Sequence, residues 1–170
     1  MTESEIVHGC LKEDRYAQKL LYDKYKDAMF TLAYRISGDF LLAEEILHDA
    51  FLKVFRGLGG FRFESTLGAW IKIIVARTAY SKIKKKVVFE PFETASHDQS
   101  VHWGNSLDTE YLENAIMALP EGYRTVFIMI EVEGFSHREV AEMLGISEGT
   151  SKSQLFHAKK KLRILLAEYL

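Results

Sequence analysis

The sequence predicts an all-α protein of two small helical domains joined by a flexible linker, the C-terminal domain being a helix-turn-helix. The chain is 170 residues long and 48% hydrophobic, which suits one ordinary domain or two small ones. Apolar residues recur at helical spacing in both halves, but not in residues 87–106, a polar and acidic stretch that contains Pro91 and Gly104. We therefore assign residues 1–86 and 107–170 to the two domains and residues 87–106 to the linker.

Two helical stretches, Arg15–Lys26 and Ala28–Ile36, are predicted at the start of the first domain, with a break at residues 38–39. The next helix has the clearest pattern, because apolar residues follow the spacing i, i+3, i+4, i+7, i+8 over Ala43–Phe55. Leu52 lies off this stripe, either as a contact for a partner protein or as an ordinary exposed leucine. The rest of the outer face is polar or charged: Glu45, His48, Asp49, Lys53 and Arg56.

Residues 57–65 are predicted to form a glycine-rich loop around Phe61 and Phe63. Two interpretations of this aromatic pair are open: the rings fill the core, or they stack on an unpaired base. A long helix is predicted next, over Leu67–Lys86, and its first turns are apolar on almost every side, as in a helix at the centre of a domain. This helix ends in a cluster of lysines: Lys82, Lys84, Lys85 and Lys86.

The second domain is predicted to begin with a helix over Leu107–Leu119, with Ser106 as its N-cap. Pro120 suits the start of the next helix, which runs to about Val132 and is closed by Gly134. Both helices precede the motif on which the functional interpretation depends.

Ser136 and Glu139 have the spacing of a capping box, which predicts the start of a short helix. Gly145 ends that helix in a sharp turn that needs a positive φ, and Ser147 caps a longer helix that runs to about Leu166. Two helices joined by a short turn containing glycine are typical of a helix-turn-helix, which reads double-stranded DNA with the first turns of its second helix. The structural alternative is a helical hairpin with one basic face.

The second helix of this motif has an inward and an outward face at 100° per residue. Leu155, Ala158, Leu162 and Leu165 point inward, together with Ser151, where an aliphatic residue would pack better. Polar residues near the start of the helix are expected at base edges: Thr150, Ser153, Gln154 and His157. Cationic side chains are expected at phosphates: Lys152, Lys159, Lys160 and Lys161.

The net charge of −2 conceals an alternation of basic and acidic segments. Residues 65–89 hold six basic and no acidic residues, and residues 90–113 hold six acidic and no basic ones. Residues 150–163 are again basic, with five cations and no acidic residue. Because local field governs phosphate binding more than the total does, the two basic segments are candidate DNA surfaces, with solvated helix faces as the alternative.

Several functional classes are not expected from this sequence. Cys10 is the only cysteine, which excludes an internal disulfide and a multi-cysteine zinc site and fits a reducing cytosol. No histidine has companions at metal-ligand spacing, so we assign no metal ion or other cofactor. The chain lacks an apolar run of about 18–20 residues, so no membrane insertion is expected. An enzyme is not expected, because there is no nucleophile–base pair, no paired carboxylates in a loop and no phosphate-binding glycine loop.

Together these motifs resemble the extracytoplasmic-function (group IV) sigma factors of the bacterial sigma-70 family. The resemblance covers nearly the whole chain, and the combination is specific in a way that a helix-turn-helix alone is not. In the first half the resemblance lies in Ala43–Phe55, Phe61–Ile71 and Ile74–Arg77. In the second half it lies in Ala118–Phe127, Gly134–Ser147 and Gly149–Leu155.

The resemblance implies a cytoplasmic bacterial transcription initiation factor that has no catalysis of its own. Such a factor binds the clamp and flap regions of core RNA polymerase and directs the enzyme to promoters through their −35 and −10 elements. It then promotes melting, so that its DNA partners are both double-stranded and melted promoter DNA. Many relatives are held by an anti-sigma factor, a further partner that the resemblance implies.

The resemblance also implies a role for individual positions of this chain. Polymerase-facing residues would be Glu45, His48, Asp49, Leu52 and Lys53. Contacts to the −10 element and to melted DNA would come from Phe61, Arg62, Phe63, Ser65, Thr66, Trp70, Lys72, Arg77, Thr78 and Lys84, with the Phe61–Thr66 loop as the pocket for a flipped base. Contacts to the −35 element would come from Gly149, Thr150, Lys152, Ser153, Gln154, His157, Lys160 and Lys161.

Four positions depart from the usual family pattern. Thr78 stands where asparagine is usual, and His48 stands where glutamine is common. Ser151 replaces an aliphatic residue, which is expected to soften helix packing. Gln154 replaces an arginine, which removes a charge and is expected to alter −35 readout.

A stand-alone helix-turn-helix regulator with an N-terminal sensor or dimerisation domain is the alternative function. The basic segment over Lys72–Lys86 argues against it, because it lies far in sequence from the helix-turn-helix. A sensor domain needs no second DNA surface.

Overall fold

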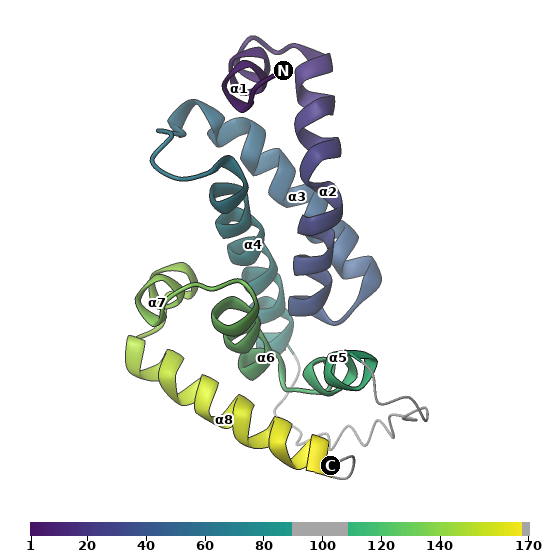
Figure 1. The fold of residues 1–170 in the computed structure, drawn as a ribbon, viewed down its shortest axis with the longest axis vertical. Helices are drawn as coiled ribbons and strands as arrows, with labels where there is room; N and C mark the ends of the chain where they lie inside the picture. The colour runs from purple at the N-terminus through teal and green to yellow at the C-terminus, as the bar shows by residue number, and fades with distance from the viewer. Residues whose placement is uncertain (90–108, 168–170) are drawn as a thin grey trace. The chain divides into compact units, whose positions relative to one another are not determined.

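The computed structural model describes residues 1–89 and 109–167, and these ranges are helical with short connections (Figure 1). The chain divides into two compact units, residues 1–82 and 83–170. The boundary falls within helix α4 (Leu67–Phe89), which extends three residues into the predicted linker. The rest of that linker, with the predicted N-cap Ser106, lies outside the described residues.

The first unit begins with a helix that the sequence pattern did not predict. Helix α1 (Glu3–Leu11) starts with a capping box, in which the Glu5 amide donates to Thr2 Oγ1 at 3.3 Å and the Thr2 amide donates to Glu5 Oε2 at 2.6 Å. It packs closely on the next helix, because a Cβ added at Gly9 would lie 2.5 Å from the Ala17 Cβ. The small side chains therefore set the distance between the two helices.

Helix α2 (Arg15–Ser37) is one continuous helix, so the prediction of two separate stretches was wrong. Polar Asp27 lies on its exposed side and does not interrupt the backbone ladder. The predicted break at residues 38–39 is confirmed: Gly38 has a φ of 69°, and the Asp39 carboxylate caps helix α3 (Phe40–Gly57) by accepting from the Leu42 amide at 2.8 Å.

The predicted inner stripe of α3 is confirmed, because the following residues are buried: Ala43, Ile46, Leu47, Ala50, Phe51 and Val54. A 3₁₀ turn, η1 (Leu58–Gly60), follows α3 and leads into the loop before α4. Helix α4 buries Leu67, Ile71 and Val75, whereas Trp70 and Ile73 are half-buried. Ala76, Ala79 and Ile83 are buried as well, so the covered face of the helix is broad.

The second unit contains helices α5 (Thr109–Met117), α6 (Glu121–Phe127), α7 (His137–Leu144) and α8 (Glu148–Ala167). A π-helical turn, η2 (Ile128–Val132), continues α6 as far as the predicted end at Val132. The buried Arg124 donates Nη1 to the carbonyls of Met117 and Leu119, at 3.1 and 3.0 Å. It therefore satisfies carbonyl groups where α5 ends, which fixes α5 against α6.

The predicted helix-turn-helix is formed by α7 and α8. The capping box is present, with the Glu139 amide donating to Ser136 Oγ at 3.1 Å and the Ser136 amide donating to Glu139 Oε2 at 2.7 Å. Gly145 has a φ of 66°, which closes α7 in the left-handed conformation that the sequence predicts. Ser147 Oγ then accepts from the Thr150 amide at 3.0 Å and caps α8.

Candidate nucleic-acid and partner interfaces

The first turns of α8 present a polar surface to solvent. Gly149, Thr150, Lys152 and Ser153 are exposed, and so are Lys160 and Lys161 two turns further along. Leu155, Ala158 and Leu162 are buried on the opposite side, which confirms the predicted inner face. The arrangement leaves hydroxyl groups flanked by cations at the start of a helix, a surface that fits a DNA groove with its phosphates on either side.

Two of the residues expected at base edges also contact α6. Gln154 is half-buried, and its Oε1 would lie 3.2 Å from a Cβ placed at Gly122. The exposed His157 ring stacks on Tyr123, with ring centroids 5.7 Å apart and planes 24° apart. Both side chains of α8 therefore lie against α6.

Ser151 is fully buried in the first turn of α8, as predicted. Its Oγ lies 2.8 Å from Nδ1 of His137, the first residue of α7, and the two atoms form a hydrogen-bonded pair. The hydroxyl thus gains a partner across the motif, whereas the expectation that a serine here softens helix packing stays a prediction.

In the loop before α4, the two aromatic residues whose role the sequence leaves open have different environments. Phe61 is 8% exposed and packs on Trp70, with ring centroids 5.4 Å apart, so it belongs to the core. Phe63 is 52% exposed, and its ring centroid lies 4.6 Å from that of Phe61. Phe63 also has a φ of 58°, a conformation that is costly for a bulky side chain and that turns its ring outwards from the buried pair.

The remaining loop residues are polar and exposed. Arg62, Glu64 and Ser65 face solvent, and the Thr66 hydroxyl accepts from the Ala69 amide at 3.2 Å. Thr66 is thus a helix cap for α4, a role that the sequence interpretation missed although a threonine before an apolar run is its usual signal. An exposed aromatic ring beside an arginine and hydroxyl groups can stack on a base and hydrogen-bond to its edge.

Along α4, the candidate DNA contacts differ in their exposure. Arg77 and Lys84 are exposed, and Lys72 is half-buried, whereas the side chains of Lys85 and Lys86 lie outside the described residues. Thr78 is buried: its hydroxyl donates to the Ile74 carbonyl at 2.7 Å and accepts from Lys53 Nζ at 3.2 Å. The expectation that Thr78 lines a DNA path is therefore corrected, because its hydroxyl is enclosed between α3 and α4.

The five expected polymerase-facing residues share one side of α3. Glu45, His48, Leu52 and Lys53 are exposed, and Asp49 is half-buried. Lys82 of α4 joins two of them, because its Nζ lies 2.6 Å from both Glu45 Oε1 and Asp49 Oδ2. We refer to Lys82, Glu45 and Asp49 as the α3–α4 clasp.

The contacts of the clasp shift the pKa values of Asp49 and Lys82. The hydrogen bond from Lys82 lowers the pKa of Asp49 more than burial raises it. Burial opposes the charged form of Lys82, but hydrogen bonds to Asp49 and Glu45 outweigh it and raise the pKa of the ammonium group. Both shifts favour the charged forms of Asp49 and Lys82, and the ion pairs hold both carboxylates of the clasp towards α4.

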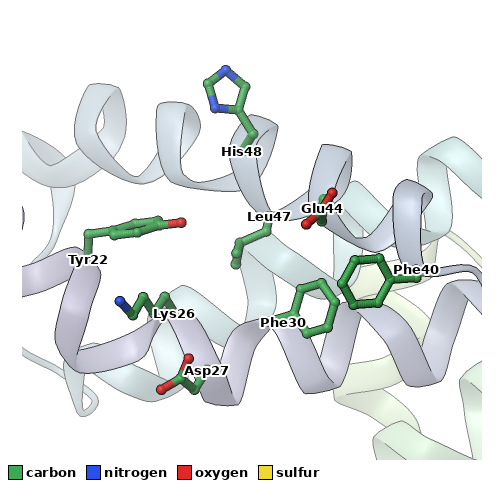
Figure 2. A pocket seen from close by; sticks show the side chains of 8 residues that line it. All are labelled: Tyr22, Lys26, Asp27, Phe30, Phe40, Glu44, Leu47 and His48. Atoms are coloured by element: carbon green, nitrogen blue, oxygen red, sulfur yellow. The ribbon is translucent and has the colours of Figure 1, made fainter.

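A shallow groove of about 370 Å³ lies between α2 and α3, beside His48 of this surface. Figure 2 shows Phe30 of α2 next to Phe40 of α3, and the T-shaped ring pair has a centroid distance of 5.1 Å. Tyr22 and Leu47 complete its apolar lining, and the other lining residues are polar or charged: Lys26, Asp27, Glu44 and His48. The surface around α3 thus combines exposed apolar groups with charges of both signs.

Within residues 1–89 and 109–167, no group of three or more histidine, cysteine, aspartate or glutamate side chains is placed to hold a metal ion. Among the helices in the same ranges, none combines the length and apolar character needed to cross a bilayer.

Comparison with known proteins finds a family match in each of the two units. Residues 21–87 match the family model for sigma-70 region 2, and residues 109–162 match the model for sigma-70 region 4. The chain is 26% identical to the extracytoplasmic-function sigma factor SigM of Mycobacterium tuberculosis, over 97% of this chain and 85% of that protein. It is 25% identical to the sigma-E factor of Escherichia coli K12, over 95% of this chain and 93% of that protein.

Solved structures agree with these matches. The sigma factor RpoE of Bartonella quintana, solved with the anti-sigma factor NepR, is 26% identical, with a TM-score of 0.62 over 88% of this chain and 96% of that one. CnrH, solved with the cytosolic domain of CnrY, shares the fold at 16% identity, with a TM-score of 0.58 over 96% of each chain. A stand-alone regulator would not account for the region 2 match in the first unit. The chain belongs to the extracytoplasmic-function sigma factors of the sigma-70 family and is a promoter-recognising transcription initiation factor for RNA polymerase.

Proposed function

We propose that the second unit reads the −35 element through the start of α8, while the first unit contacts core polymerase and the −10 element. One observation carries the first part: α8 follows a short turn, and the exposed Thr150 and Ser153 in its first turns are accompanied on the same helix by the exposed Lys152 and Lys160. Hydroxyl groups can bond to base edges, and the cations reach the phosphates that fix the register of the helix. The −35 set also includes Gly149, Gln154, His157 and Lys161.

For the −10 element, the proposed pocket is the loop over residues 61–66 with Phe63 as its stacking surface. A base that leaves the duplex loses its neighbours, so a pocket must return stacking and hydrogen bonds to it. Phe63 offers an exposed ring above the buried Phe61, and Arg62 and Ser65 are exposed beside it. Lys72, Arg77 and Lys84 would follow the backbone of the melted strand, with Trp70 and Thr66 supporting the loop.

The clamp of the largest polymerase subunit is the proposed partner of α3. Leu52 is a large apolar group, 41% exposed, with Asp49, Lys53 and His48 on the same side of the helix. An exposed apolar group with polar residues around it matches the apolar centre and polar rim of a protein–protein interface. The flap region is the proposed contact for the second unit, which would place α8 at the −35 element within the holoenzyme.

We also propose an anti-sigma factor as a regulator of this chain. The proposal is supported by the solved relative RpoE of Bartonella quintana, which is in complex with the anti-sigma factor NepR and covers 88% of this chain. Melting itself needs no catalytic residue of this protein, because binding energy in the holoenzyme is sufficient to hold the unpaired strand. The site of action would be the bacterial cytoplasm.

Run-off transcription with purified core polymerase tests this proposal. Core enzyme with the full chain is given a library of promoters randomised in both elements, and the transcribed templates are sequenced. The proposal predicts two enriched motifs at a fixed separation, one upstream and one near the start site. If transcribed templates show no upstream motif, the proposed role of α8 is contradicted. If transcription requires this protein but no motif is enriched, promoter recognition by both units is contradicted.

A further inference from the structure

The first turn of α8 is held by two side-chain hydrogen-bond systems. Ser147 Oγ accepts from the Thr150 amide at 3.0 Å and donates to Thr150 Oγ1 at 2.9 Å, which fixes the end of the helix. Ser151 Oγ pairs with His137 Nδ1 at 2.8 Å, which ties the same turn to the first residue of α7. The two systems lie on adjacent residues of one turn.

The hydrogen bond between Ser151 and His137 is partly buried, whereas the other residues of this turn are exposed. Ser151 is fully buried and His137 is half-buried, whereas Gly149, Thr150 and Lys152 are exposed on the same turn. An aliphatic contact between two helices tolerates small rotations, but a hydrogen bond weakens steeply away from its preferred angle. The bond therefore defines how the start of α8 is rotated about its own axis.

We propose that His137 is a positioning residue for −35 readout, acting on Thr150 and Ser153 through its hydrogen bond to Ser151. Rotation of the first turn by a few degrees moves the hydroxyl groups that are proposed to reach base edges, while the lysines further along α8 are less affected. The proposal rests on the proposed function of α8 as the −35 reader. It assigns a role to His137, which lies outside the proposed DNA surface.

The chemistry of the pair makes the two partners unequal. Removing the imidazole leaves the Ser151 hydroxyl buried without its partner, whereas removing the hydroxyl leaves a half-buried imidazole that can bind water. Replacing both groups by apolar ones removes the unsatisfied hydroxyl. The effects of His137→Leu and Ser151→Ala on stability are thus expected to be non-additive. The double variant should be no less stable than His137→Leu alone.

The test uses the full chain with core polymerase and the −35 sequence that the parent selects from the randomised library. Transcription is measured on that promoter and on a panel with single −35 substitutions, which gives a discrimination ratio for each variant. Three variants probe the pair: His137→Leu, Ser151→Ala and His137→Asn, whose amide can reach the position of Nδ1. Thr125→Val is the matched control, because it removes another buried hydroxyl of the second unit, bonded to the Glu121 carbonyl at 2.7 Å.

A positioning role predicts that His137→Leu and Ser151→Ala each lower the discrimination ratio by about fivefold, the scale of one poorly read base pair. His137→Asn should stay within about twofold of the parent, and Thr125→Val should lower the melting temperature without changing the ratio. A ratio that stays at the parent value in His137→Leu and Ser151→Ala, with a loss of stability like that of Thr125→Val, would overturn the positioning role. His137→Leu alters a half-buried side chain, so it keeps the test decisive if Ser151→Ala fails to fold.

The outcome also separates this inference from the proposed function. A parent protein that selects no −35 motif would overturn both. A parent that selects a clear motif, with variants that read it equally well, would overturn only the role of His137.

Discussion

The Lys82 ammonium group of α4 lies 2.6 Å from the Asp49 carboxylate of α3, and Glu45 accepts from the same group at 2.6 Å. Two of the residues proposed to face polymerase therefore already have a partner within the first unit. Substituting either carboxylate would alter the α3–α4 contact and the proposed interface together. Leu52, one turn further along α3, offers a cleaner probe because it is an exposed apolar residue on the same side.

Leu52→Arg is expected to weaken binding to core polymerase by about tenfold or more, because a charge would replace an apolar group at the centre of the interface. Stability should change by less than about 0.5 kcal/mol, as is usual for an exposed position. Binding is measured by fluorescence anisotropy of the labelled full chain titrated with core enzyme. Leu11→Arg is the matched control, a leucine of the same unit that is 50% exposed on α1. Equal affinities of the two variants would contradict the assignment of α3.

The α3–α4 clasp predicts a window of pH in which Lys82 stabilises the fold. Asp49 has a pKa below its ordinary value of 3.8, so its contribution is present above that value and is lost as pH falls through the lower folded value. Lys82 has a pKa above 10.5, so its contribution is complete below 10.5 and is lost as pH rises through the higher folded value. The difference in melting temperature between the parent and Lys82→Met should be constant near neutrality and shrink in acid. A difference that persists unchanged at about pH 2, below the carboxylate range, would contradict the clasp.

Thr78→Val tests the correction of this residue from a DNA contact to a buried link between α3 and α4. The change removes a buried hydroxyl that bonds the Ile74 carbonyl and Lys53, so stability should fall by about 1 kcal/mol in urea unfolding. Promoter opening, followed by permanganate reactivity, should stay at the parent level. The neighbouring exposed Arg77 supplies the comparison, since Arg77→Ala should weaken opening with little effect on stability. Impaired opening in Thr78→Val at parent-like stability would restore Thr78 to the DNA path.

The lysines of α8 are expected to differ in their contribution to the salt dependence of −35 binding. Lys152 and Lys160 are exposed, whereas the Lys159 ammonium lies 2.8 Å from the Glu131 carboxylate and is partly neutralised. Lys152→Ala and Lys160→Ala should each reduce the slope of log affinity against log salt by about 1. Lys159→Ala should reduce it by less, and Glu131→Gln should restore Lys159 as a phosphate contact. Identical slopes for all three lysine variants would show that the Glu131 pair has no effect.

Periodicity and capping signals were sufficient to predict much of the fold. The inner stripe of α3 and the turn at Gly145 follow from local rules, because each depends on residues a few positions apart. Helix α1 was missed although Thr2 and Glu5 carry a capping signal, since its apolar pattern is short. The continuity of α2 through Asp27 was missed because one polar residue on an exposed side does not end a helix.

The details of the sites depend on contacts that no local pattern contains. Ser151 and His137 are 14 residues apart, and the hydroxyl was interpreted as a defect because its partner lies on another helix. Phe61 and Phe63 look alike in the sequence, but in the structure Phe61 is buried, whereas Phe63 has a positive φ and an exposed ring. Thr78 lies in an apolar helix and is enclosed by Lys53, a residue of α3.

The division of promoter reading between the two units is tested most directly by repeating the library selection with Phe63→Ala and with Gln154→Arg. Phe63 is exposed in the loop before α4, and Gln154 lies in the first turns of α8. The account predicts that Phe63→Ala changes only the preferences near the start site and that Gln154→Arg changes only the upstream motif. Identical selected motifs for the parent and both variants, or a change in the opposite element, would contradict it.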